Sequence, residues 1–569
     1  MKHSRRYIVF ALVLAMVFTL QFHILELDTN QIGKFRGAVM AEEIWNPIIA
    51  KDVNDNGIRI VIDNKVYSGK DYNFYMNANR SVMVPVEILT ETLKCSASVY
   101  NEKQLVVKKY TNYIRMPIDE FVARMNGEDV LLKSPFVSYK GEYYVSIEEL
   151  AKLLGYEVKF DIDTFTLNAV NKVELTSFVP TRFDLREEGR VSTVRNQGAY
   201  GTCWAFATVC AIESRLRPEE NTLYSVDHMT MNNSFHSNQY DGGEYTMGMA
   251  YLAAWQGPVF ETDDPYGDGK TNNSLHAEKH VQEMQIIESK DLKRIKECVF
   301  LYGGVQSSLY STMNTKNQSN RYYNGDTNSY CYIGTEKPNH DILIVGWDDN
   351  YSKSNFNVPL EGDGAFICQN SWGTDFGEDG FFYVSYYDTN IGTHNVVYTK
   401  IEEKNNYDRI YQSDLCGWVG KIGYNEEDMY GANVYTADAA ERICAAGFYA
   451  TGPNTEYEVY VVKNFVNENS FEKKEKVASG VLENAGYYTV NFEETIDVQQ
   501  GEKFAIVLYV KTPGAEHPMA IEYDNGDYIM LDVDLTDGES YISYSGLKFT
   551  NVKATKNCDL CIKAYTKER

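Results

Sequence analysis

The most informative part of the sequence reads Asn196-Gln197-Gly198-Ala199-Tyr200-Gly201-Thr202-Cys203-Trp204-Ala205-Phe206. An almost entirely apolar segment follows as far as Arg217, and Pro218 ends it. Because proline does not continue a helix, the pattern predicts a buried helix that begins at Cys203. The N-terminus of a helix favours an anion, so this position stabilises a thiolate, which is the nucleophilic form of cysteine.

A nucleophilic thiolate needs a proton partner, and His340 is the one histidine of the mature region in an informative context. It heads the apolar stretch Asn339 to Trp347, far downstream of Cys203. Asn370 ends a second predicted strand, after His340 in the chain, where its amide could hold an imidazole ring. The three residues then supply the nucleophile, base and orienting group that acyl transfer requires.

Together these motifs resemble the papain family of cysteine peptidases. The resemblance runs from Phe183 to Phe381, and it implies a two-lobed domain with one helical lobe and one β-barrel-like lobe. It implies that Cys203 is the nucleophile and His340 the general base. It further implies that Asn370 orients the imidazole, that Trp372 shields their hydrogen bond, and that the Gln197 side chain and the Cys203 backbone N–H form the oxyanion hole.

The same resemblance implies a thiolate–imidazolium pair at rest, with a thiol pKa of about 3 to 4, the range quoted for papain itself. Gly242 and Gly243 would pair with an extended peptide, so the expected substrate is a polypeptide. Ser308 and Asp341 would line the pocket for the second residue on the acyl side. Asp341 could favour a basic or polar group there, or its side chain could face solvent.

The sequence departs from the family pattern at several points. Tyr200 and Tyr240 stand where the family has the two cysteines of one disulfide. The loop from Asp348 to Asp363 is long and could border the cleft. The usual inhibitory helical propeptide is not visible upstream, so the hypothesis is that the preceding domain, or residues 172–178, keeps the enzyme silent.

The N-terminus has the features of an export signal. Lys2, Arg5 and Arg6 precede an apolar run from Tyr7 to Leu20, and small residues follow up to Ala41. This pattern predicts a signal peptide over residues 1–41, cleaved after Ala41. An uncleaved membrane anchor is the alternative. Either fate places the protein outside a bacterial cell, secreted or on the cell surface.

Residues 55–171 contain an internal repeat of two related units. The stretch Val84 to Leu89 aligns with Val145 to Leu150, and each copy combines alternating strands with a short helix. The pattern resembles the noncatalytic N-terminal domain first named from copper amine oxidases. Copper is not expected, because only His3 and His23 precede residue 228 and both lie in the export segment.

Residues 408–569 have the strand and turn pattern of a β-sandwich. They resemble the lectin-like domain attached to papain-type peptidases on bacterial surfaces, which implies binding to a cell-wall or host glycan, although a purely structural role is the alternative. The acidic turns Asp524 to Asp527 and Asp532 to Asp537 could coordinate calcium, but clustered Asp is also ordinary turn chemistry.

Three weaker signals are interpreted as structural. Cys558 and Cys561 have the spacing of a zinc pair, but two further ligands are lacking nearby. His276 and His280 lie four positions apart, and a solvated helix face is favoured over a metal site. Cys210 and Cys368 fall in apolar segments and are expected in the core. No metal site is therefore predicted in the protease domain.

The 569 residues predict an α+β multidomain chain, with the protease domain over residues 179–400. The net charge of −26 makes nucleic acid a poor partner. Two functions follow. The first is an exported cysteine endopeptidase that hydrolyses peptide bonds through a thioester. The second is a surface adhesin or glycan-binding protein whose protease domain is inactive.

Overall fold

The computed structural model describes residues 57–62, 65–100, 102–109, 112–125, 128–161, 163–171, 179–524, 526 and 533–569. The predicted export segment 1–41 and residues 172–178 lie outside these ranges, as do the acidic-turn residues Asn525 and 527–532. The chain divides into two compact units, residues 1–178 and 179–569. Within the described ranges, the helices are all too short or too polar to cross a bilayer.

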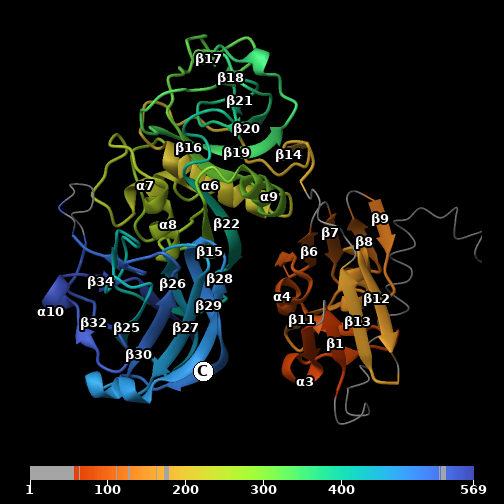
Figure 1. The fold of residues 1–569 in the computed structure, drawn as a ribbon, viewed down its shortest axis with the longest axis vertical. Coiled ribbons are helices and arrows are strands. Elements are labelled where there is room, and N and C mark those ends of the chain that lie inside the picture. The colour runs from red at the N-terminus through yellow and green to blue at the C-terminus, as the bar shows by residue number, and fades with distance from the viewer. Residues whose placement is uncertain are drawn as a thin grey trace, which may run out of the picture. The chain divides into compact units, whose positions relative to one another are not determined.

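The first unit is mixed α and β (Figure 1). Its sheets have the strand orders β12-β13-β1-β2, β10-β11-β4-β3 and β5-β6-β7-β8-β9. The strands are β1 (Arg59–Ile62), β2 (Lys65–Ser68), β3 (Tyr75–Met76), β4 (Val82–Pro85), β5 (Ser96–Tyr100), β6 (Gln104–Lys109), β7 (Asn112–Pro117), β8 (Val122–Met125), β9 (Glu128–Leu131), β10 (Val137–Tyr139), β11 (Glu142–Ser146), β12 (Tyr156–Asp161) and β13 (Thr166–Asn171). The helices are α3 (Gly69–Tyr72), η2 (Val86–Ile88), α4 (Leu89–Leu93) and α5 (Ile147–Leu153).

The sequence repeat of this unit is also a structural repeat. Strands β4 and β11 pair antiparallel, and Val84 lies opposite Val145, its counterpart in the alignment. The short helices that follow bury equivalent positions, Leu89 and Leu150, each fully enclosed. The two copies therefore share one hydrophobic core.

In the second unit, residues 179–401 form a helical lobe and a sheet lobe. The helices are α6 (Cys203–Leu216), α7 (Val226–Met231), α8 (Tyr245–Ala253) and α9 (Leu292–Tyr302), and the 3₁₀ turn η3 covers Lys353–Asn355. The strands are β14 (Arg182–Asp184), β15 (Lys279–Ile287), β16 (Val305–Leu309), β17 (Tyr323–Asn324), β18 (Ser329–Tyr330), β19 (His340–Asp348), β20 (Ala365–Gln369), β21 (Phe381–Ser385) and β22 (Asn395–Glu403).

Residues 402–569 add further β-strands and two short helical turns. The strands are β23 (Arg409–Tyr411), β24 (Gly420–Ile422), β25 (Asp428–Thr436), β26 (Glu441–Ala450), β27 (Thr455–Val462), β28 (Glu475–Leu482), β29 (Ala485–Val498), β30 (Lys503–Lys511), β31 (Met519–Glu522), β32 (Ser540–Ser543), β33 (Thr550–Asn551), β34 (Asp559–Leu560) and β35 (Ile562–Glu568). The turns are η4 (Glu468–Lys473) and α10 (Lys553–Lys556).

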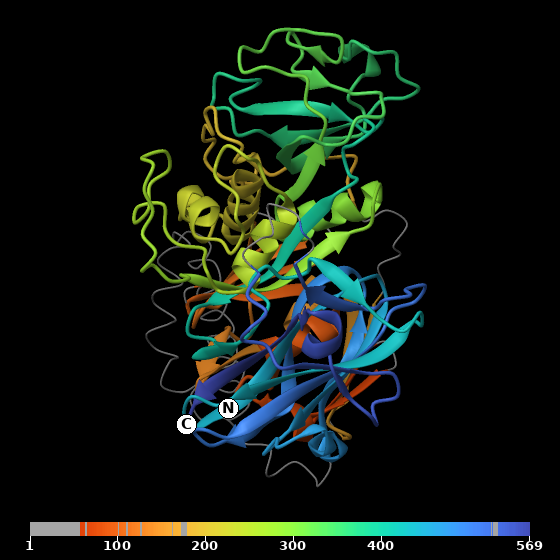
Figure 2. The ribbon, with the colours of Figure 1, turned by 90° about the vertical axis from the view of Figure 1, so that its left-hand side faces the viewer.

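One long sheet connects the protease-like part to the C-terminal part. Its order is β17-β18-β21-β20-β19-β16-β22-β15-β29-β26-β35-β23, and β14 pairs with β19. Strands β15 and β22 lie between the helices and the C-terminal strands (Figure 2). The junction is the pairing of β15 with β29, in which Gln285 lies opposite Gly486. The two parts therefore share backbone hydrogen bonds and are not joined by a flexible linker alone.

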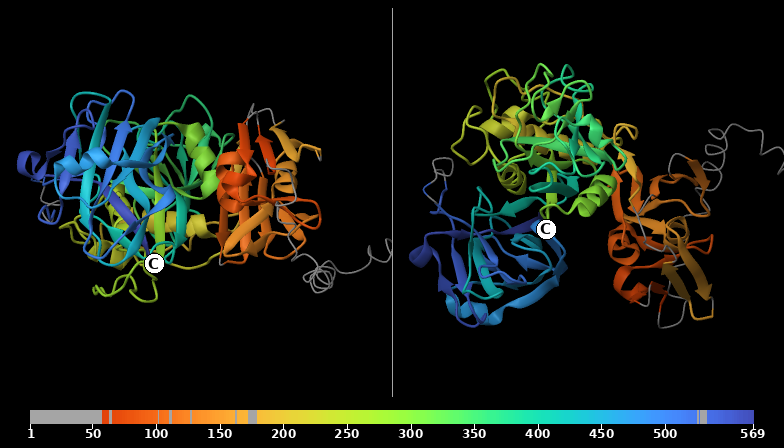
Figure 3. Two further views of the ribbon diagram at one scale, coloured as in Figure 1. Left: turned by 90° about the horizontal axis from the view of Figure 1, so that it is seen from below. Right: turned by 45° about the horizontal axis from the view of Figure 1, so that its top comes forward.

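The C-terminal part is a two-layer sandwich (Figure 3). Strands β29, β26, β35 and β23 contribute one layer, and the order β28-β27-β30-β25-β32-β33 forms the other. Buried side chains from both layers, such as Phe448 and Leu508, meet in one core. The structure confirms the predicted fold class, an α+β multidomain chain with a papain-like domain and a β-rich C-terminal domain.

Candidate active site

Helix α6 carries Cys203 at its first position, as the apolar pattern predicts. All of its residues from Trp204 to Leu216 are buried, so the helix lies inside the domain. It packs against β19, the strand that begins at His340. The backbone amides of Asp341 and Trp204 favour the thiolate of Cys203. The helix start and the strand start therefore bring the sulfur beside the residue that follows His340.

His340 and Asn370 are brought together by strand pairing. Strands β19 and β20 are antiparallel, with Leu343 opposite Gln369, so the end of β20 returns to the start of β19. Asn370 Oδ1 accepts a hydrogen bond from His340 Nε2 at 2.8 Å. The same oxygen accepts from the Ser371 backbone N–H at 2.8 Å, which fixes its identity because a backbone N–H only donates.

The hydrogen bond determines which ring nitrogen of His340 can act as a base. Since Nε2 donates to Asn370, a neutral ring carries its lone pair on Nδ1. The Trp372 ring lies 4.9 Å from the His340 ring, between centroids, and is tilted by 31°. His340 and Asn370 are both buried. The bond is thus enclosed and covered by an aromatic ring.

Burial shifts the pKa values of Cys203 and His340 in opposite directions. Desolvation raises the pKa of the Cys203 thiol to about 12, with a further contribution from the Asp341 charge. Desolvation lowers the pKa of His340 to about 4, against the bond to Asn370, which raises it. Each effect favours the neutral form, whereas the family resemblance implies an ion pair at rest. An ion pair here requires that thiolate and imidazolium stabilise one another, because opposite charges at close range favour the charged forms.

Gln197 is held at three points. Its backbone N–H donates to Ser371 O at 2.8 Å, and its side-chain Oε1 accepts from Ser371 Oγ at 2.6 Å. Its Nε2 donates one hydrogen to Tyr200 O at 2.7 Å. A carboxamide nitrogen carries two hydrogens, so one remains for another acceptor. Ser371 therefore positions Gln197, a role that the sequence pattern did not indicate.

The glycine pair Gly242-Gly243 lies close to the start of α6, and each position favours glycine for a different reason. Gly242 has φ +84°, a conformation that favours glycine. A Cβ on Gly201 would lie 2.7 Å from Gly242 N, and a Cβ on Gly243 would overlap the indole of Trp204. The two glycines thus lie against the segment that carries Cys203, where the resemblance expects the peptide to bind.

The Asp341 carboxylate is bonded inside the domain. Ser308 Oγ donates to its Oδ1 at 2.6 Å, and Gln306 Nε2 donates to its Oδ2 at 3.0 Å. Asp341 is 9% exposed, so its side chain faces the interior of the domain and not the solvent. Burial raises its pKa, and these hydrogen bonds oppose that rise. Gln306, on the same strand as Ser308, was not singled out by the sequence, although the spacing of two places both on one face.

Two tyrosines are in contact where the family pattern has a disulfide. The rings of Tyr200 and Tyr240 lie 5.0 Å apart and are tilted by 52°. Tyr240 is 71% exposed, so one ring of the pair faces solvent. The ten cysteines of the chain are all described, and none of them forms a disulfide bond. Aromatic packing therefore joins these two loops without a covalent bond.

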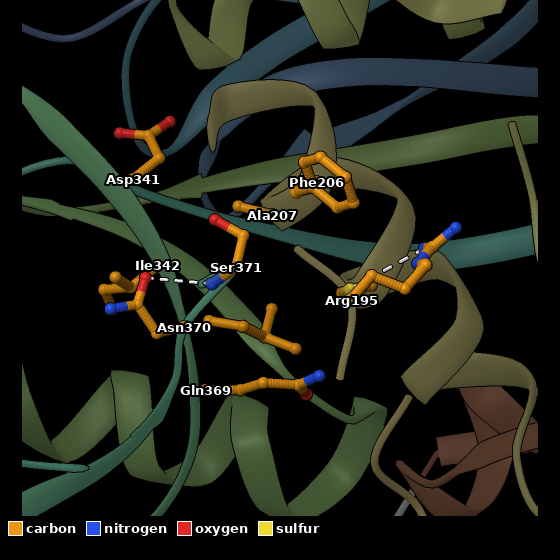
Figure 4. Close-up of a pocket in the computed structure, with 10 residues that line it drawn as sticks. Arg195, Phe206, Ala207, Asp341, Ile342, Gln369, Asn370 and Ser371 are labelled. Carbon is orange, nitrogen blue, oxygen red and sulfur yellow. Dashed lines mark hydrogen bonds between the residues drawn. The ribbon is translucent and has the colours of Figure 1, made fainter. Parts of the chain in front are cut away.

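A small cavity lies beside the candidate site, between α6, β19 and β20 (Figure 4). Figure 4 shows Asn370 and Ser371 next to each other, joined by the bond between the Asn370 oxygen and the Ser371 backbone nitrogen. The cavity is lined by Arg195, Phe206, Ala207, Cys210, Asp341, Ile342, Leu343, Gln369, Asn370 and Ser371. Cys203 and His340 do not line this cavity, although their neighbours Asp341 and Asn370 do.

The long loop after β19 packs against the sheet lobe. Phe356 is buried with Cys331 and Ala365 in a small core of its own. The side chains of Asn324 and Thr327 bond to Asn355 O, at 2.9 and 2.7 Å. The loop is thereby fixed to the β17–β18 hairpin.

The interpretation of His276 and His280 as a solvated helix face is wrong. His280 lies on strand β15, is buried, and stacks on Trp255 with the ring centroids 3.5 Å apart. His276 lies in the preceding loop. The spacing of four fits a helix, but the following apolar positions continue the strand to Ile287 and pair with β22. Tertiary pairing overrides the local pattern here.

The other candidate metal ligands are spread through the sandwich. Cys558 and Cys561 are both buried, and Cys561 Sγ bonds to Gly417 O at 3.2 Å. In the described parts of the acidic turns, Asp524 and Asp534 accept hydrogen bonds from their own turns. Over the described ranges, His, Cys, Asp and Glu side chains form no group of three or more that could hold a metal ion.

The fold of residues 179–401 is that of a papain-like protease domain. Residues 179–401 match the papain family cysteine protease, residues 61–168 the copper amine oxidase N-terminal domain, and residues 410–566 the lectin like domain. Residues 179–401 therefore form a papain family cysteine protease domain, and the predicted resemblances are confirmed for all three regions.

Among solved structures, the second unit is similar to a clostridial cysteine protease, Cwp84, in a form described as following propeptide cleavage. The identity is 27%, the TM-score is 0.61, and the match covers 68% of this chain and 99% of the other. A structure of the cysteine protease and lectin-like domains of Cwp84, described as a surface layer associated protein of Clostridium difficile, matches with 26% identity and TM-score 0.60, over 70% and 90%. The protease and lectin-like parts thus occur together in another protein.

Among curated proteins, the chain is similar to a viral cathepsin of Autographa californica nuclear polyhedrosis virus. The two are 28% identical over 214 residues, which is 36% of this chain and 59% of the relative. The chain thus spans less than two thirds of the length of that relative. The similarity concerns the protease domain.

Proposed function

We propose that the chain is an exported cysteine endopeptidase in which Cys203, His340 and Asn370 perform the reaction. The observation that carries the proposal is the 2.8 Å bond from His340 Nε2 to Asn370 Oδ1, together with a cysteine at the N-terminus of α6 that interacts with the backbone amide of Asp341, the residue after His340. This arrangement presents an oriented imidazole and a thiol whose ionised form is favoured by backbone amides.

In the proposed reaction, His340 Nδ1 takes the proton of Cys203, and the sulfur forms a bond to the carbonyl carbon of the substrate. The π electron pair moves to the oxygen, where the second Nε2 hydrogen of Gln197 and the Cys203 N–H stabilise the negative charge. The intermediate collapses, the C–N bond breaks, and the leaving amine takes the proton from His340. Water, deprotonated by the same ring, then attacks the thioester and releases the acid and the thiol.

Two further residues support this geometry. Trp372 covers the His340–Asn370 bond, and a hydrogen bond in a site that excludes water is stronger than one in contact with solvent. Ser371 fixes Gln197 from the segment that carries Asn370. The base, its orienting group and one oxyanion donor are therefore linked through adjacent residues of one strand end.

The proposed substrate is a polypeptide in extended conformation along Gly242 and Gly243. Glycines leave the backbone open, so a peptide can add to it as a strand. Ser308 and Asp341 are proposed to line the pocket that receives the second residue on the acyl side of the cleaved bond. Because the Asp341 carboxylate already accepts from Ser308 and Gln306, its negative charge, rather than a free carboxylate oxygen, would favour a basic group.

For the flanking parts, we propose a location at the bacterial surface and contact with a glycan through residues 410–566. The match to the lectin like domain and the similarity to a surface layer associated protein support this proposal. Calcium in the acidic turns and cleavage after Ala41 remain proposals of the same kind. Mass determination of the mature N-terminus tests the cleavage.

Active-site labelling distinguishes the peptidase from an inactive surface adhesin. A peptidyl epoxide that alkylates thiolates should label the full chain once, and Cys203→Ala should abolish both the labelling and the hydrolysis of fluorescein-labelled casein. Cys298→Ala, at a buried cysteine on α9, is the matched control and should leave the labelling unchanged. Labelling of Cys203→Ala equal to that of the wild type contradicts the proposal and favours the adhesin, which glycan arrays with Cys203→Ala would then examine.

A further inference from the structure

The hydroxyl group of Tyr266 lies between the two segments that carry the proposed oxyanion donors. It donates to Gln197 O at 2.8 Å, and it lies 2.7 Å from Thr202 Oγ1. A tyrosine hydroxyl has one hydrogen, so its contact with Thr202 is one in which Thr202 donates. One oxygen atom therefore bonds to the residue that provides the side-chain donor and to the residue that precedes Cys203.

Thr202 is committed to this bond. It is the N-cap residue of α6, yet its side chain makes no capping hydrogen bond to the helix. The residue is completely buried. A threonine at this position ordinarily caps the helix with its hydroxyl. Here the hydroxyl bonds to Tyr266, and it is attached to the peptide unit whose N–H belongs to Cys203.

Tyr266 is itself held rigidly. Its ring packs edge-on against Phe206 on α6, with the centroids 4.8 Å apart. Its backbone N–H donates to Glu261 Oε1 at 3.1 Å, and the next N–H, of Gly267, donates to Asp227 Oδ2 at 2.7 Å. Burial raises the pKa of Tyr266 to about 12, so the hydroxyl keeps its proton at neutral pH. Tyr266 can therefore fix the distance between its two partners.

We propose that Tyr266 is a positioning residue for the oxyanion hole, acting through Gln197 and Thr202. The inference rests on the proposed function, because it assigns those donors to the substrate oxygen. Pre-organised donors contribute most when charge develops on that oxygen in the transition state. Loss of the hydroxyl should therefore lower kcat more than it changes KM.

The test replaces only the hydroxyl, with Tyr266→Phe in the full chain. We expect kcat for fluorescein-labelled casein to fall about 10-fold or more, short of the roughly 10²- to 10³-fold lost with a direct donor. The inhibition constant of a peptide aldehyde, acetyl-Leu-Leu-argininal, should rise in parallel, because its adduct places charge on the same oxygen. Alkylation of Cys203 by iodoacetamide, which forms no oxyanion, should keep its rate.

The matched control is Tyr251→Phe, which removes another buried hydroxyl of the same lobe. Tyr251 OH lies 2.6 Å from His228 Nδ1 and contacts neither donor segment. It should leave both the aldehyde inhibition and kcat unchanged. If Tyr266→Phe does not fold, as judged by circular dichroism, Thr202→Val removes the same bridge from the other side and should show the same pattern, with a smaller effect for Thr202→Ser.

The outcomes distinguish failure of the proposed function from failure of the proposed role of Tyr266. A wild-type chain without Cys203-dependent hydrolysis overturns the proposed function and the role of Tyr266 together. An active wild type with Tyr266→Phe equal to it in kcat and aldehyde inhibition overturns the role of Tyr266 alone. A variant that loses alkylation and aldehyde binding equally also overturns it, since that result indicates general damage to the site.

Discussion

The Oδ1 atom of Asn370 lies 2.8 Å from the Nε2 atom of His340, and the Ser371 backbone N–H bonds to the same oxygen. The imidazole is thereby held with Nδ1 as its free nitrogen. The proposed nucleophile, Cys203, comes from a helix much earlier in the chain. The bond between His340 and Asn370 therefore determines which ring nitrogen is available to accept a proton.

Removal of this orienting group should lower the rate without abolishing binding. For Asn370→Ala we expect kcat for labelled casein to fall about 10- to 100-fold, the usual range for a partner that orients a functional histidine. KM should change little, because the proposed path of the peptide lies along Gly242 and Gly243, whereas Asn370 bonds to His340. Steady-state kinetics at pH 7 check this. An equal kcat in both proteins would show that the ring holds its orientation without the amide.

Without His340, the buried thiol of Cys203 should be alkylated slowly at neutral pH. Burial, with a contribution from the Asp341 charge, raises the pKa of Cys203 to about 12. In His340→Ala, alkylation by iodoacetamide at pH 7 should therefore fall at least about 100-fold and recover as pH rises toward 11, since the thiolate reacts. Mass spectrometry of the labelled peptide measures the rate. Equally fast alkylation at pH 7 would mean that backbone amides alone ionise the sulfur.

The charge of Asp341 opposes ionisation of Cys203. Its Coulombic contribution raises the pKa of the thiol, so Asp341→Asn should lower that pKa and shift the acid limb of the alkylation profile to lower pH. An asparagine has nearly the same shape and keeps one acceptor oxygen, so it can retain the bond from Ser308 while it loses the bond from Gln306 Nε2. A substrate library in the same experiment should show weaker preference for basic residues. An unchanged profile would indicate that Asp341 is protonated over the pH range tested.

The stability of the second unit should decrease as pH rises because of Glu522. Burial beside Asp414 raises the pKa of Glu522 to about 8, above its ordinary 4.5. The folded state then binds the proton more tightly, so this stabilisation is complete below pH 4.5 and is lost as pH rises to 8. The slope can reach about 1.4 kcal/mol per pH unit.

Urea unfolding at pH 5, 6.5 and 8 in a Cys203→Ala background measures this effect, and Glu522→Gln should flatten the dependence. The glutamine side chain does not titrate, so the stability of this variant should change less between pH 5 and 8 than that of the parent. Glu516→Gln, at an exposed loop residue, is the matched control. Parallel curves for Glu522→Gln and the parent would assign the pH dependence to other groups.

The junction between the protease domain and the sandwich should be sensitive to one methyl group. Gly486 has φ +142°, and a Cβ there would overlap the backbone of Met284 and Gln285 on β15. We expect Gly486→Ala to cost about 1–3 kcal/mol or more and to separate the unfolding of the two parts. Gly501→Ala has a positive φ and no such contact, so it isolates the cost of backbone strain. A single transition equal to that of the control would show that the pairing contributes little.

Several features followed from local sequence because they depend on local physics. The apolar run after Cys203 could only be buried, and its helix ends at Leu216, next to Pro218. The strand at His340 is likewise continuous and buried. By contrast, His280 and His276 have helical spacing but lie on a strand and in a loop, since pairing with β22 determines that segment. Local patterns do not report pairing between distant strands.

The sequence by itself determined the residue types, the order of the domains and the elements that carry Cys203, His340 and Asn370. Only the tertiary structure decided how they are joined: Asn370 to His340, Ser371 to Gln197, and Tyr266 to both Gln197 and Thr202. It also decided that the sandwich continues the protease sheet through β15 and β29. The physical reason is that hydrogen bonds between distant segments depend on packing distances, which periodicity and composition do not contain.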